Sequence, residues 1–155
     1  MTTSPKPKGQ ARSAARLAAV QALYQNDMET GPLASLLDEF HRHRLGAEVD
    51  PDLDGVEYID AEVAFFDDVV KGTTARRDEI DALLASKLAE GWSLARLDRT
   101  MLQILRAGTY ELIARPDVAT ATAISEYLDV AHAFFESREA KFVNGVLDAV
   151  AKVVR

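Results

Sequence analysis

The stretch DRTMLQILRAGTYELIA, residues 98–114, decides the fold of this chain. Wound into a helix, it carries apolar side chains on nearly all sides, at Met101, Leu102, Ile104, Leu105, Ala107, Tyr110, Leu112 and Ile113. A helix that is hydrophobic all round lies inside a protein rather than on its surface. Pro116 ends the helix, because the residue before a proline disfavours the helical conformation. The stretch therefore predicts the central helix of a bundle.

Helical periodicity continues on both sides of this stretch. After it, Thr120 is expected to cap a fifth helix, which buries Ile124, Leu128, Ala131 and Phe135. Before it, apolar residues recur every three or four positions from Asp60 to about Leu88. If unbroken, that segment is a helix of about 40 Å at 1.5 Å per residue. Gly72 is the candidate kink, and Gly91 ends this helix or the turn after it.

Two more helices are expected near the N-terminus, over about 11–26 and over 32–44, where Pro32 suits the first helical position. Residues 46–60 are rich in acids and contain Pro51 and Gly55, so we expect a loop. No long segment alternates apolar and polar residues. The predicted fold is all-α, a compact bundle of six to seven helices. It forms a single domain over 11–155 behind a flexible basic tail over 1–10.

Composition excludes several classes of protein. The chain has 155 residues, of which 48% are hydrophobic, so it can bury a core. It has no cysteine, which removes disulfides, thiolate catalysis and cysteine-ligated zinc. No apolar run approaches the roughly 20 residues that a membrane-spanning helix needs. No hydrophobic segment follows the N-terminal charges, so we expect no secretory signal.

The charge is unevenly distributed along the chain. The net charge is −7, yet residues 1–16 carry Lys6, Lys8, Arg12 and Arg16 and no acid. Residues 27–68 hold most of the acids of the N-terminal half. A basic arm on an acidic protein can bind a polyanion over a short contact, or it can be a solvated tail. Charge alone leaves both interpretations open.

No catalytic or metal-binding pattern emerges from the sequence. His41 and His43 alternate with arginines that would repel a metal cation, and His132 flanks a helix. The acidic run from Asp50 resembles a calcium loop but has Ala61 at its twelfth position, where the bidentate glutamate belongs. Glycine-rich phosphate loops and nucleophile elbows are also missing. We therefore expect no enzyme activity, no metal and no cofactor.

Both ends of the chain carry cations at helical spacing. Arg12 and Arg16 are four residues apart, and Lys8 lies one turn earlier, which makes a basic ridge suited to phosphates. In the last helix, Phe142 lies about 100° from the valine stripe, at 100° per residue. Arg138 falls one turn before Phe142, and Lys141 precedes it directly. This pattern suits stacking on a nucleobase, although Phe142 could equally pack against a neighbouring helix.

The dipeptide Asn144-Gly145 interrupts the last valine stripe. A glycine inside a helix costs about 1 kcal/mol relative to alanine. Gly145 is therefore expected either to admit a neighbouring helix at close range or to mark the junction of two short helices.

Three ordered motifs resemble a known family. ARSAARLAAVQALYQND near the start, LQILRAGTYELIARPDVATATAISEYLDVAHAF in the middle and KFVNGVLDAV near the end are similar to those of the bacterial transcription antitermination NusB family. The resemblance covers about residues 11–155. It implies two three-helix subbundles and a cytoplasmic protein with neither cofactor nor catalysis. It also implies binding to boxA RNA of ribosomal RNA leaders with ribosomal protein S10, alongside RNA polymerase and other Nus factors.

The resemblance also implies residue roles. RNA contacts would come from the cations and the aromatic at matching positions, namely Lys8, Arg12, Arg16, Lys141 and Phe142, with Arg138 where the family often has an acid. Contacts with S10 would come from Tyr24 and from the start of the central helix, where Met101 occupies the position of a family acid and Asp98 lies one turn earlier. Ser13 and Ala14 replace cations of other members, so RNA binding by this chain alone should be weak.

Two other functions fit the same helical pattern. Some ribosomal RNA methyltransferases carry this fold as an accessory domain, but they need a following catalytic domain. A purely structural adaptor is the other alternative. Free family members are monomers or homodimers, and the dimer covers the RNA-binding surface.

Overall fold

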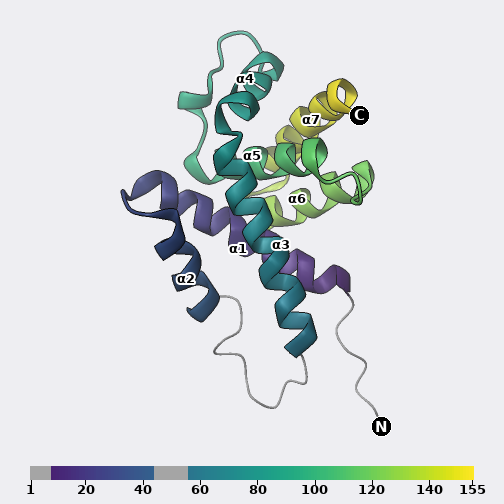
Figure 1. The fold of residues 1–155 in the computed structure, drawn as a ribbon. Coiled ribbons are helices and arrows are strands. Elements are labelled where there is room, and N and C mark those ends of the chain that lie inside the picture. The colour runs from purple at the N-terminus through teal and green to yellow at the C-terminus, as the bar shows by residue number, and fades with distance from the viewer. Residues whose placement is uncertain (1–7, 44–55) are drawn as a thin grey trace. The chain divides into compact units, whose positions relative to one another are not determined.

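The computed structural model describes residues 8–43 and 56–155, with side chains over 10–42 and 63–155. The helices are α1 (Lys8–Met28), α2 (Leu33–His43), α3 (Val56–Ala75), α4 (Arg77–Lys87), a short 3₁₀ helix η1 (Leu94–Arg96), α5 (Arg99–Ala114), α6 (Thr120–Phe134) and α7 (Ser137–Val154) (Figure 1). The described residues contain no strand. The predicted all-α fold and its number of helices are therefore confirmed.

The chain forms two compact units, which meet in sequence inside α3, between Val70 and Lys71. The first unit contains α1, α2 and most of α3. Its core joins the alanine-rich face of α1 to leucines of α2 and to two aromatic rings, Phe40 and Phe66, which stack at 5.6 Å between centroids. His41 lies beside this pair, with its Nε2 2.5 Å from Oδ1 of Asp67. This histidine has a carboxylate partner within the unit.

The second unit is built around α5, which contacts α4, α6 and α7. Every residue from Met101 to Leu112 is buried, as the apolar stretch predicts. Asp98 begins the helix, because its carboxylate accepts hydrogen bonds from the backbone N–H groups of Thr100 and Met101 at 2.8 and 3.1 Å. Such a cap satisfies donors that the first turn of a helix leaves without partners.

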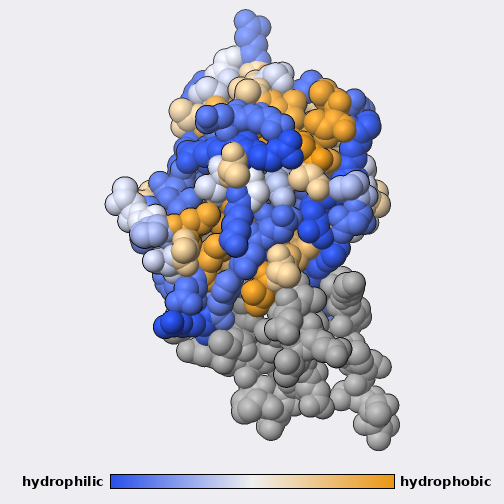
Figure 2. Space-filling model, viewed as in Figure 1, coloured by the Kyte–Doolittle hydropathy of each residue, from blue (hydrophilic) through white to orange (hydrophobic). Residues whose placement is uncertain are grey.

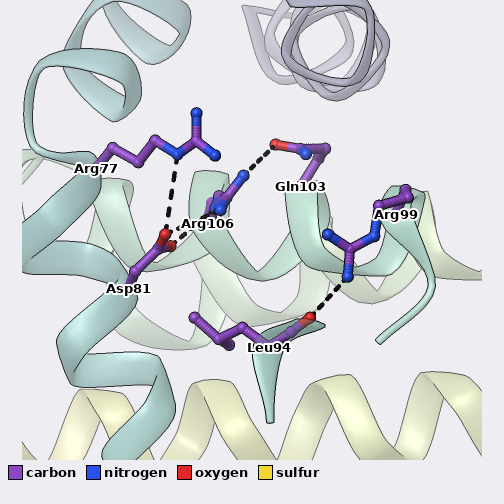
Figure 3. Close-up of polar contacts among 6 residues, drawn as sticks. All are labelled: Arg77, Asp81, Leu94, Arg99, Gln103 and Arg106. Atoms are coloured by element: carbon purple, nitrogen blue, oxygen red, sulfur yellow. Dashed lines mark hydrogen bonds and ion pairs between the residues drawn. The ribbon is translucent and has the colours of Figure 1, made fainter. Parts of the chain in front are cut away.

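A buried arginine on α5 is neutralised from α4. Nε and Nη2 of Arg106 donate to the two carboxylate oxygens of Asp81 at 2.8 and 2.9 Å (Figure 3). Arg77 approaches the same carboxylate at 3.9 Å. A charge inside a protein is tolerated only when it is paired, and a bidentate pair also fixes orientation. This pair sets the register of α4 against α5.

Arg155 closes the other end of α5. Its guanidinium donates to the carbonyl oxygens of Glu111, Leu112, Arg115 and Val118 at 2.6–3.2 Å. The last carbonyls of a helix have no partner within the helix and carry partial negative charge. One side chain at the end of α7 therefore satisfies the end of α5 and the loop that follows it.

Several predictions about helix ends and kinks are wrong. The loop expected over 46–60 ends earlier, because α3 begins at Val56. The segment over 60–88 is not one helix, because α3 ends at Ala75 and α4 begins at Arg77. Gly72 does not kink it. Gly72 instead lies within α3, where a Cβ atom would be 2.1 Å from Cζ of Tyr110, so glycine makes room for this ring. Thr120 is not a cap either, since α6 has Ala119 at its N-cap, and the Thr120 hydroxyl accepts from Arg155.

Candidate nucleic-acid interface

The first group of candidate residues lies on α1. Lys8 is the first residue of the helix, and its side chain falls outside the described side chains. Arg12 is half-buried, whereas only 2% of Arg16 is exposed. The helical spacing of the predicted ridge is present. Arg16, however, does not lie on an open surface, so it is a poor candidate for direct contact with a phosphate.

Both arginines lie against the ring of Phe65 from α3. The guanidinium carbon Cζ of Arg12 is 4.7 Å from the ring centroid, and that of Arg16 is 4.9 Å from it. Both distances are within the range of about 6 Å for an attractive interaction between a cation and an aromatic ring. Phe65 itself is 3% exposed, so its ring belongs to the core of the first unit.

The second group lies on α7, in the second unit. Arg138 and Lys141 are exposed, and Phe142 is half-buried. The stripe beneath them is buried as predicted, at Val143, Val146, Leu147 and Val150. Phe142 is thus partly packed against the protein and partly exposed to solvent. It can therefore offer one part of its surface to a ligand.

The Asn144-Gly145 dipeptide does not interrupt α7, which is continuous from Ser137 to Val154. A Cβ atom at Gly145 would meet nothing within 4 Å. Both explanations offered by the sequence are therefore wrong, since no helix among the described residues approaches Gly145 and α7 has no break. Both residues are exposed, so the dipeptide lies on the outer side of the helix.

A shallow groove of about 270 Å³ lies beside the cations of α7. Leu128 and His132 of α6 form one side of it, and Ala140, Lys141 and Asn144 of α7 form the other. It offers a positive charge, polar groups and an apolar floor in one place.

The three predicted partner-binding residues differ in accessibility. Tyr24 is exposed on α1, and Met28, one turn later, is 57% exposed. By contrast, the carboxylate of Asp98 caps α5, and Met101 is buried. Tyr24 and Asp98 are thus exposed, although the Asp98 carboxylate is engaged in the cap, and Met28 extends the apolar face at Tyr24. The sequence showed Met28 at this spacing, but its exposure could not be read from it.

Another exposed feature, an aromatic ring beside an arginine, was not identified from the sequence. Trp92, in the turn after α4, is 51% exposed, and Cζ of Arg96 lies 5.0 Å from its ring. Gly91 shapes this turn with a φ of +88°, a conformation that side chains disfavour. Arg99 stabilises the residues that follow, because it donates to the carbonyl oxygen of Leu94 (Figure 3) and to that of Leu97. The spacing of an aromatic and an arginine four residues apart was the available signal.

Other kinds of site find little support in the described part of the chain. Its histidines and carboxylates form no group that could hold a metal ion. None of its helices is long and apolar enough to cross a membrane. On the face shown in Figure 2, hydrophobic residues form separate patches among hydrophilic ones.

The comparisons with known proteins agree on one family. Residues 13–152 match the family described as the NusB family. The chain is 74% identical, over 95% of its length and 97% of the relative's, to the transcription antitermination protein NusB of Novosphingobium aromaticivorans. NusB of T. maritima has a similar structure, with a TM-score of 0.72, 28% identity and coverage of 96% and 93% of the two chains.

A second similar structure, at 24% identity and a TM-score of 0.72, supports the fold alone. It is of the antitermination factors NusB and NusE in complex with double-stranded RNA, and the match covers 93% of this chain and 98% of the other. Family match, sequence identity and fold agree over nearly the whole length. This chain therefore belongs to the NusB family.

Proposed function

We propose that this protein is an RNA-binding transcription antitermination factor of the bacterial cytoplasm. It pairs with ribosomal protein S10 on boxA RNA of ribosomal RNA operons, and it supports processive transcription together with RNA polymerase and other Nus factors. The observation that carries the proposal is the exposed Lys141 next to the half-buried Phe142, within the motif KFVNGV that resembles a motif of the NusB family. The name of its relatives, transcription antitermination protein, supports the antitermination part of this proposal.

The proposed RNA contacts divide between the two groups. On α1, Lys8 and Arg12 contact phosphates, whereas the buried Arg16 acts indirectly, through its positive charge. On α7, Arg138 and Lys141 contact phosphates, and Phe142 stacks on a base. Stacking on an aromatic ring contributes about 1–3 kcal/mol per base. Because the chain carries a net charge of −7, the contact is short and local rather than spread over the surface.

S10 binds the exposed face of α1 formed by Tyr24 and Met28. Asp98 and Met101 contribute by shaping the start of α5, since one caps it and the other is buried there. RNA binding by this chain alone is weak, and much of the affinity depends on S10. A free homodimer, if it forms, competes with RNA.

The test is binding of a boxA-type RNA with and without the cognate S10 over a series of salt concentrations. Each contact with a phosphate of single-stranded RNA steepens the fall of log affinity with log salt by about 0.7. Lys141→Gln should shallow this slope by about that amount. Lys152→Gln is the matched control, because Lys152 is an exposed lysine of the same helix, paired with Asp148 at 3.1 Å, outside the proposed contact.

Absence of RNA binding with and without S10 would overturn the proposal and favour a structural adaptor. Binding of RNA that is unaffected by S10 would favour an accessory domain of the kind found in RNA methyltransferases. Equal slopes for Lys141→Gln and Lys152→Gln would remove α7 from the proposed interface.

A further inference from the structure

We propose that Phe65 is a positioning residue for the RNA contact of α1, an inference that rests on the proposed function. Phe65 need not touch RNA to do this. Its ring lies 4.7 Å from the guanidinium carbon of Arg12 and 4.9 Å from that of Arg16. One ring from α3 thus holds two cations that are four residues apart on α1.

Two like charges at this spacing on a helix repel each other. The face of an aromatic ring carries negative potential, and it attracts a cation by an amount equivalent to about twofold to thirtyfold in an equilibrium constant. The attraction is largest where water is excluded, and Phe65 and Arg16 are 3% and 2% exposed. The ring therefore offsets the repulsion and keeps both guanidinium groups in one place.

The two arginines differ in burial and therefore in role. Arg16 stays inside the unit, where its fixed positive charge adds to the local potential. Arg12 is only half-buried, so it is the arginine that can meet a phosphate. A long side chain that is already held before binding loses less conformational freedom on binding. Phe65 thereby raises RNA affinity through Arg12, without a contact of its own.

A simpler account is that the arginine stems only cover a core ring, as arginines commonly do. The two accounts differ in one respect. If Phe65 acts through Arg12, the effect of losing the ring must disappear when Arg12 is already absent. If Phe65 acts only through the stability of the unit, its loss must weaken RNA binding equally in both backgrounds.

The experiment is a double-mutant cycle of Phe65→Leu and Arg12→Gln, measured as affinity for boxA-type RNA in the presence of S10. We expect Phe65→Leu to lower affinity about threefold to tenfold in the wild-type background and less than twofold in the Arg12→Gln background. Phe65→Tyr, which keeps the ring, should bind within twofold of wild type. Phe66→Leu is the matched control, because Phe66 is buried in the same helix and stacks on Phe40 instead.

Each variant is first checked by circular dichroism and urea unfolding, so that binding is measured on folded protein. If Phe65→Leu does not fold, Phe65→Met replaces it as a longer and more adaptable side chain without a ring. Equal losses in both backgrounds, or a loss for Phe66→Leu as large as for Phe65→Leu, would overturn the inference while wild-type binding upholds the proposed function. Lack of binding by the wild-type protein would overturn both.

Discussion

Two regions of this protein combine a phenylalanine with two cations, and they are built in opposite ways. On α1 the arginines lie against Phe65, a core ring that comes from another helix, and Arg16 is enclosed. On α7 the cations Arg138 and Lys141 are exposed, and Phe142 belongs to the same helix. Under the proposed function, the first region is assembled before RNA arrives, whereas the groups of the second would be organised by the RNA. Similar composition therefore does not imply a similar mode of binding.

The largest expected difference between the two regions concerns stability. Phe65→Ala should lower the free energy of unfolding by about 3–5 kcal/mol, because it leaves a cavity in a packed core. Phe142→Ala should lower it by only about 1–2 kcal/mol, since less apolar surface is lost from burial. Urea unfolding, monitored by circular dichroism, measures the free energy of unfolding of both variants. If the two variants lose the same free energy of unfolding, Phe142 is a core residue, and the two regions do not differ in this respect.

The next effect concerns RNA. Phe142→Ala should weaken binding of boxA-type RNA in the presence of S10 by about 1–3 kcal/mol, the contribution of one base stacked on an aromatic ring. Val153→Ala serves as the control, because Val153 is an exposed apolar residue of the same helix. If the two variants bind RNA equally well, Phe142 does not stack on a base.

A smaller effect separates exposed from enclosed cations. Arg12→Gln and Lys141→Gln should each weaken RNA binding several-fold and shallow the salt slope by about 0.7. Arg16→Met, which keeps an apolar stem, should change the slope by less than half as much, because Arg16 is enclosed and is not one of the proposed phosphate contacts. A full change of slope for Arg16→Met would show that α1 opens on binding, and that its arrangement is not fixed in advance.

Much of this fold follows from periodicity. The stretch over 98–114 predicts the buried α5, and the last valine stripe predicts the buried face of α7. In these helices burial follows the spacing of the apolar residues, so this spacing alone predicts which faces are buried. The break between α3 and α4 at Arg76 was not predictable in this way, because no proline lies there and Gly72, the nearest glycine, is used to admit Tyr110.

The candidate site was predictable only in part. Sequence spacing identified the cations, and the resemblance to a family gave them a role. Whether Arg12 or Arg16 faces solvent depends on Phe65, which is distant in sequence and enters through tertiary packing. The capping role of Asp98 was also hidden, because an aspartate before a helix suits both a cap and a contact with a partner.

The smallest expected effect tests whether the outer side of α7 is open. Gly145→Ala should raise the free energy of unfolding by about 0.5–1 kcal/mol, because alanine loses less backbone entropy in a helix. A Cβ atom there would meet nothing within 4 Å, so no clash offsets the gain. Gly72→Ala is the opposing control, since its Cβ atom would lie 2.1 Å from Tyr110 and should destabilise the protein.

RNA affinity in the presence of S10 then reports on how near the ligand comes to Gly145. A gain in stability with affinity within twofold of wild type would place the RNA on the Lys141 side of α7. A gain in stability with a clear loss of affinity would mean that the RNA backbone passes over Gly145 itself, where a methyl group blocks it. In that case the motif keeps its glycine for the ligand, at a cost to the helix of about 1 kcal/mol.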